Sequence, residues 1–156
     1  MYKQILVAVD GSRGGRRALD EAVKVAKATG GAVQALCVVQ HPARLVDIST
    51  GFAEEQTRQS AEADAATAAL EEAKTVFAQA GITGTTRAAD SSGEEIAAVI
   101  LRIAAEEDAD LVVLGTRGLS GVKRLLLGSV AESFLRIADR PVMLVREDAT
   151  QASEAA

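Results

Sequence analysis

Five short apolar segments alternate along this chain with four longer segments that have helical periodicity. The strand-like segments are Gln4–Val9, Ala32–Val39, Ile82–Ala88, Asp110–Leu114 and Pro141–Val145. The helical segments are Arg13–Thr29, Phe52–Ala80, a third marked by Ile96, Val99, Ile100 and Ile103, and Ser129–Ala138. Parallel strands need a long crossover between them, and a helix is the usual crossover. The alternation therefore predicts an α/β fold with a five-stranded parallel sheet and helices on both faces.

Local signals refine three of these elements. In the long second helix the predicted buried stripe is Ala61, Ala65, Ala69, Ala73, Val76 and Phe77. Two overlapping capping boxes, Ser91-x-x-Glu94 and Ser92-x-x-Glu95, precede the third helix. The third strand-like segment is the most polar, which predicts a place at the edge of the sheet.

Composition excludes several functional classes. A chain of 156 residues is long enough for one domain with a full core. Its net charge of −5 disfavours a surface for nucleic acid or anionic membrane, and an aromatic content of 3% leaves few platforms for stacking bases. We therefore expect no nucleic-acid or membrane partner. Met1 leads almost directly into the first strand without a leader sequence, so a cytoplasmic location is expected.

The single cysteine and the single histidine predict no metal site. Cys37 lies in an apolar strand, where a small core residue is a better interpretation than a nucleophile. His41 has no second histidine or cysteine cluster with which to hold zinc.

A glycine-bearing loop joins the fourth strand to the last helix and carries the strongest functional signal. It reads Gly115-Thr116-Arg117-Gly118, then nine residues that include Gly121, then Gly128-Ser129. Glycine lets backbone amides approach an anion, and a helix start supplies unpaired donors, so the loop is suited to phosphate. The basic residues Arg117, Lys123 and Arg124 favour the same role. The loop matches neither a Walker A sequence nor Gly-x-Gly-x-x-Gly.

Each of these residues also has a structural alternative. The glycines serve equally well as turn residues, and Ser129-x-x-Glu132 is a capping box in which the hydroxyl only caps the helix. Asp10, at the end of the first strand, is followed by Gly11-Ser12 and fits a helix cap or a turn.

The spacing Gly-x2-Gly-x9-Gly-Ser resembles the ATP-binding signature of the universal stress protein family. The resemblance extends from Tyr2 to about Arg146 and implies one domain over residues 1–146, followed by a disordered polar tail at 147–156. It implies the strand order 3-2-1-4-5, a Rossmann-like sheet of the adenine nucleotide alpha hydrolase type. In that order the first and fourth strands are neighbours, so Asp10 and the glycine loop converge on one crevice.

The resemblance also implies an ATP site, and it leaves open whether Mg²⁺ accompanies the nucleotide. Asp10 matches the family's ribose contact, while Ala8, Val9 and Val38 match residues beside adenine. At Val38 the resemblance implies a backbone amide that can pair with the edge of the base. Cys37 departs from the pattern, because many relatives have histidine there. The full set of predicted nucleotide-binding residues is Ala8, Val9, Asp10, Val38, Gly115, Thr116, Arg117, Gly118, Gly121, Gly128, Ser129 and Val130.

The function expected from the resemblance is a cytoplasmic, ATP-binding regulatory module for stress response. Nucleotide state would act as the signal to a regulatory protein partner, and the module would form a homodimer through the fifth strand at Val142 and Leu144. No nucleophile paired with a base is visible in the sequence, so no catalytic residue is predicted and hydrolysis is expected to be slow or absent. The alternatives are a slow ATP hydrolase and a protein-interaction module without a nucleotide role.

Overall fold

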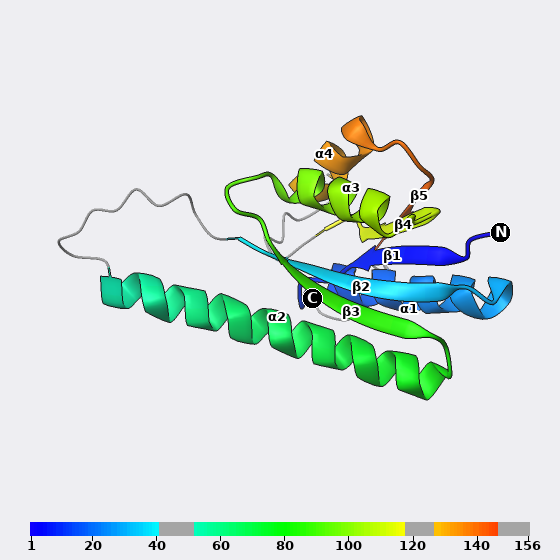
Figure 1. The fold of residues 1–156 in the computed structure, drawn as a ribbon, viewed down its shortest axis with the longest axis horizontal. Coiled ribbons are helices and arrows are strands. Elements are labelled where there is room, and N and C mark those ends of the chain that lie inside the picture. Colours follow the sequence, from blue (N-terminus) through cyan, green and yellow to red (C-terminus); the bar gives the residue numbers. More distant parts are fainter. Residues whose placement is uncertain (41–51, 118–126, 147–156) are drawn as a thin grey trace, which may run out of the picture.

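A computed structural model describes residues 1–40, 52–117 and 127–146 of the chain. Its strands are β1 (Gln4–Ala8), β2 (Ala32–Val39), β3 (Gly84–Asp90), β4 (Leu111–Gly115) and β5 (Val142–Val145). Its helices are α1 (Arg13–Thr29), α2 (Phe52–Ala80), α3 (Ile96–Glu106) and α4 (Ser129–Ile137). The elements follow one another in the predicted order (Figure 1).

The strands form one parallel sheet in the order β3-β2-β1-β4-β5, which confirms the predicted topology. In the middle of the sheet Val7 stands opposite Ala35 of β2 on one side and Val113 of β4 on the other. β3 and β5 are the two edge strands. The polar third strand therefore lies at an edge, as its composition predicts.

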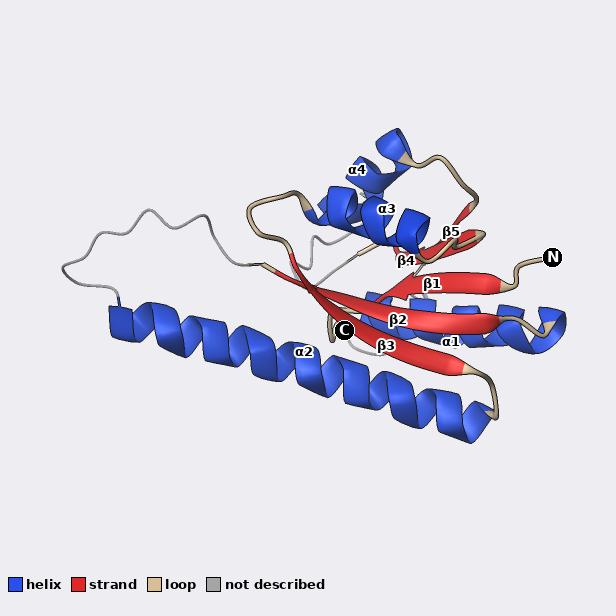
Figure 2. Cartoon of the chain, viewed as in Figure 1, coloured by secondary structure: helices blue, strands red, loops and turns tan. Residues whose placement is uncertain are grey.

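Helices cover both faces of the sheet, α1 and α2 on one side and α3 and α4 on the other (Figure 2). Because successive side chains of a strand point to opposite faces, Ile5 and Val7 pack under α1 and α2, while Leu6 packs under α3 and α4. Burial of both faces explains why the central strands are apolar throughout instead of alternating.

The long helix α2 buries a different stripe at its beginning than the sequence predicts. Ala69, Ala73 and Phe77 are buried, but Ala61 and Ala65 are exposed, and Ala66 takes the buried position instead. The first four predicted positions, from Ala61 to Ala73, are four residues apart, whereas the buried positions 66, 69, 73 and 77 mix steps of three and four. Mixed steps follow a straight helical face more closely, because a turn holds 3.6 residues.

Neither predicted capping box forms at the start of α3. Glu95 is the N-cap, and its side chain makes no capping hydrogen bond. Asp90 explains the difference, because its carboxylate accepts the backbone N–H of Ser92 (2.8 Å) in a tight turn at the end of β3. Ser92 there takes a left-handed conformation with φ 50°. Both predicted capping serines thus belong to the turn that precedes the helix.

None of the helices in the described part of the chain combines the length and the hydropathy that a membrane span requires.

Candidate functional site

A crevice opens where the crossovers from two neighbouring strands leave the sheet in opposite directions. β1 and β4 pair directly, yet α1 packs on one face of the sheet and α4 on the other. Ligands of open α/β sheets bind at such a point, at the carboxyl ends of the strands. Here a cavity of about 470 Å³ occupies the crevice.

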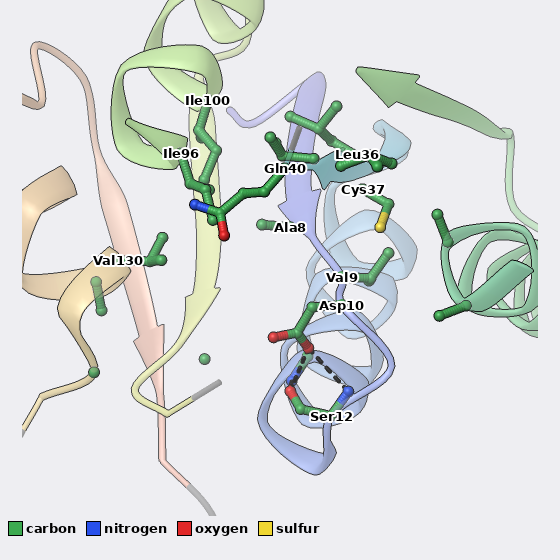
Figure 3. Close-up of a pocket in the computed structure, with 18 of the residues that line it drawn as sticks. Ala8, Val9, Asp10, Ser12, Leu36, Cys37, Gln40, Ile96, Ile100 and Val130 are labelled. Atoms are coloured by element: carbon green, nitrogen blue, oxygen red, sulfur yellow. Dashed lines mark hydrogen bonds between the residues drawn. The ribbon is translucent and has the colours of Figure 1, made fainter. Parts of the chain in front are cut away.

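The cavity has an apolar part and a polar part (Figure 3). Ile96 and Ile100 of α3 and Leu36 of β2 surround the apolar part, beyond Ala8. Asp10 and Ser12 lie on the other side of Ala8. The complete described lining is Ala8, Val9, Asp10, Ser12, Gly15, Leu36, Cys37, Val38, Val39, Gln40, Glu62, Ala65, Ala66, Ile96, Ile100, Gly115, Arg117, Gly128, Ser129, Val130 and Ala131.

Asp10 is a turn former whose carboxylate is only partly used. Its Oδ1 accepts the Ser12 backbone N–H (2.9 Å) and the Ser12 hydroxyl. Ser12, and not Asp10, is the N-cap of α1, because its hydroxyl accepts the Gly15 N–H (3.1 Å). Among the described residues Asp10 Oδ2 has no hydrogen-bond partner. The side chain is therefore held rigidly with one oxygen free to accept from a ligand hydroxyl.

The start of α4 differs from the predicted capping box. Gly128 is the N-cap, and its carbonyl accepts the Glu132 N–H (3.0 Å), so Ser129 is the first helical residue. Gly128 has no side chain with which to cap the helix. Amides in the first turn of a helix have no intrahelical acceptor. Three of the residues in that turn, Ser129, Val130 and Ala131, line the cavity and leave this end of the helix suited to an anion.

Close packing of α1 on β4 gives two glycines a structural role. A Cβ on Gly115 would stand 2.6 Å from the carbonyl carbon and oxygen of Gly14. A Cβ on Gly14 would in turn overlap the carbonyl oxygen of Arg117. Gly115 thus has a packing reason to be glycine that is independent of any ligand. Gly14 lies at the same contact and was not among the predicted site residues.

Most of the predicted binding residues meet at the cavity. Those that line it are Ala8, Val9, Asp10, Val38, Gly115, Arg117, Gly128, Ser129 and Val130. Thr116 is not among the lining residues; its backbone pairs with β5 and with Gly128. The remaining predicted positions lie outside the described residues: Gly118, Gly121, Lys123, Arg124, His41 and the tail at 147–156.

The residues that complete the apolar part were not predicted as binding residues. Ile96 and Ile100 lie one helical turn apart and were used only to mark the third helix, although both line the cavity. Gln40 follows β2 directly and was assigned no role. The strand alternation could have predicted that Gln40 reaches the site, because residues 36, 38 and 40 share one side of an extended strand.

Cys37 lines the cavity but behaves as a core residue, being 5% exposed. Burial raises the pKa of its thiol, and the nearby Asp10 carboxylate raises that pKa further. A thiol with a raised pKa stays protonated near neutral pH and is a poor nucleophile.

Comparison with known proteins gives a consistent family. The sequence model of the universal stress protein family matches residues 1–146. Universal stress protein YxiE of Bacillus subtilis is 32% identical over 152 residues, covering 94% of this chain and 100% of the relative. The structure of universal stress protein UspA from Lactobacillus plantarum matches with a TM-score of 0.80 at 26% identity, covering 93% of this chain and 98% of that one.

Two further similar structures are complexes with nucleotides. One is a universal stress protein in complex with cAMP, with a TM-score of 0.68 and 27% identity over 92% of this chain and 97% of that one. The other is the universal stress protein from Archaeoglobus fulgidus in complex with dAMP, with a TM-score of 0.64 and 27% identity over 92% of this chain and 97% of that one. By its sequence match and its fold, this chain belongs to the universal stress protein family.

Proposed function

We propose that the cavity at the carboxyl ends of β1 and β4 binds an adenine nucleotide, with ATP as the ligand. The observation that supports this proposal most strongly is the division of one cavity of about 470 Å³ into an apolar part and a polar part, the latter including a helix start. A nucleotide has the same division, between a flat base and its phosphates. Two similar family members whose structures contain cAMP and dAMP support the adenine base.

In this proposal each part of the nucleotide has its own contacts. The base lies in the apolar part, against Ala8 and Val38. The ribose hydroxyls donate to the free Oδ2 of Asp10, since a carboxylate is a strong acceptor for hydroxyls. The phosphates lie at the start of α4, where Ser129 offers a hydroxyl and Arg117 a positive charge. Mg²⁺ would arrive with the triphosphate, because it is commonly held by one or two carboxylates together with substrate phosphates.

We infer a binding module in preference to a catalyst. Of the two carboxylates in the described lining, Asp10 is assigned to the ribose and Glu62 is an exposed residue of α2. In the described part of the chain no three His, Cys, Asp or Glu side chains gather closely enough to hold a metal ion by themselves. We therefore infer that nucleotide occupancy is a signal, read in the cytoplasm by a regulatory protein partner.

We further propose a homodimer that pairs β5 with its copy. β5 is an edge strand whose Val142 and Leu144 pack only partly into the core. A partly exposed apolar edge is an aggregation hazard unless something covers it, and a second copy of the same strand is a suitable cover.

Native mass spectrometry of the purified protein tests both proposals together. We expect a dimer mass, and a mass increment of one adenine nucleotide per chain after incubation with ATP. A folded protein that takes up no nucleotide would favour the alternative of an interaction module whose glycine loop is structural. A strictly monomeric mass would reject the dimer without affecting the nucleotide site.

A further inference from the structure

We propose that Gln40 is a specificity-determining residue that recognises the edge of the base; this inference rests on the proposed nucleotide site. Gln40 lines the cavity and follows the last residue of β2. Figure 3 draws its side chain on the same side of Ala8 as Ile96 and Ile100, which also line the cavity.

The register of β2 explains this position. Cys37 and Val39 point toward α1 and α2, whereas Leu36 and Val38 point toward α3 and α4. Continued by one step, the alternation directs Gln40 to the α3 side of the sheet, where the base is assigned. The backbone therefore aims this side chain at the base and away from the phosphates.

Gln40 is chemically distinct within the described lining. Asp10 and Ser12 lie on the far side of Ala8, with the polar groups of the α1 start. Ile96 and Ile100, whose side chains are aliphatic, line the cavity on the same side of Ala8 as Gln40. Among the described residues the carboxamide has no hydrogen-bond partner, and the side chain is exposed. It is therefore a free donor and acceptor pair in an otherwise aliphatic part of the cavity.

A carboxamide matches the edge of adenine atom for atom. Its oxygen accepts from the 6-amino group, and its NH₂ donates to the neighbouring ring nitrogen, as glutamine does when it pairs with adenine in nucleic acids. The aliphatic side chains of the cavity would hold any purine of similar size. Gln40 would therefore add a side-chain hydrogen bond that selects for the 6-amino group.

The test compares ATP with purine riboside 5′-triphosphate, which lacks only that amino group, in the parent and in Gln40→Leu. For the parent we expect ATP to bind about two- to ten-fold more tightly, the range of one uncharged hydrogen bond. In Gln40→Leu the preference for ATP should fall by that factor, and both ligands should weaken because both lose the hydrogen bond to the ring nitrogen. Because Gln40 is exposed, leucine there should not unfold the protein, and circular dichroism checks this.

Asp10→Asn is the matched control, because Asp10 is assigned to the ribose that both ligands share. It should weaken both ligands in parallel and leave their ratio at the parent value. A Gln40→Leu protein that keeps the parent ratio overturns the inference, as does a parent that binds the two ligands equally. A parent that binds neither ligand overturns the proposed function itself, which separates the two failures.

Discussion

Asp10 combines a structural and a proposed binding role in the two oxygens of one carboxylate. Oδ1 holds the turn into α1 by accepting the Ser12 N–H (2.9 Å). Oδ2 has no partner in the described part of the chain, and it is the atom that we assign to the ribose. A useful variant must therefore remove the charge without removing the turn. Asparagine meets this condition, because its side-chain oxygen forms the same turn.

Asp10→Asn should weaken ATP binding while sparing inorganic triphosphate. Loss of a charge-assisted hydrogen bond costs about 1.5–3 kcal/mol, roughly a ten- to hundred-fold rise in the dissociation constant. Inorganic triphosphate has no ribose, and removal of a negative charge should leave its affinity equal or higher. Competition against labelled ATP measures both ligands. Equal losses for the two would make Asp10 a purely structural residue.

Gly115→Ala should destabilise the fold before any ligand is considered. The new Cβ would stand 2.6 Å from the backbone of Gly14, so α1 and β4 would have to separate. Overpacking of this kind costs about 1–3 kcal/mol in the free energy of unfolding. Urea denaturation measures the change. An unchanged midpoint and slope would show that the contact between Gly14 and Gly115 does not constrain this position.

At the scale of elements, β5 presents every second backbone amide to the open edge of the sheet. The carbonyls of Pro141 and Val145 accept the amides of Val112 and Thr116, so alternate residues of β5 face β4. Met143 belongs to that inward set. Val142 and Leu144 lie between these positions, so their backbone groups face outward.

Val142→Pro should therefore dissociate the proposed dimer and preserve the monomer fold. Proline removes an outward N–H that a second β5 would need, and proline is tolerated on an edge strand at such positions. Analytical ultracentrifugation should give a monomer with an unchanged helical circular dichroism signal. Met143→Pro is the control, because it removes an inward N–H and should lower the melting temperature. A Val142→Pro protein that remains folded and dimeric places the interface elsewhere.

Element boundaries were predictable where a local signal fixes them. The predicted bounds of α1 match the structure because Ser12 caps one end and Gly30, with φ 74°, closes the other. β3 was predicted two residues early. There the Ile82 N–H bonds back to Phe77 of α2 (3.3 Å), so Ile82 belongs to the turn that ends the helix. A composition-based prediction cannot separate such an apolar helix-end residue from the strand that follows.

At the scale of the whole molecule, the alternating pattern predicted the class of fold but not the neighbours in the sheet. The order 3-2-1-4-5 came from the family resemblance, and the pairing of β1 with β4 in that order brings Asp10 and Ser129 to one cavity. The residues that belong to the family's motifs were therefore predicted from the sequence. Gln40 and Ile96 carry no motif, and they reach the cavity through strand register and helix packing, which depend on the folded structure.

Equilibrium dialysis of the nucleotide-free protein against labelled ATP tests the central claim most directly, because it counts occupied sites without relying on a heat or a spectral change. We predict saturation at one ATP per chain, with excess unlabelled ATP displacing the label. At about 1 mM ATP a site with a binding free energy of only about −4 kcal/mol is half filled. Absence of binding up to that concentration would contradict the proposed nucleotide site.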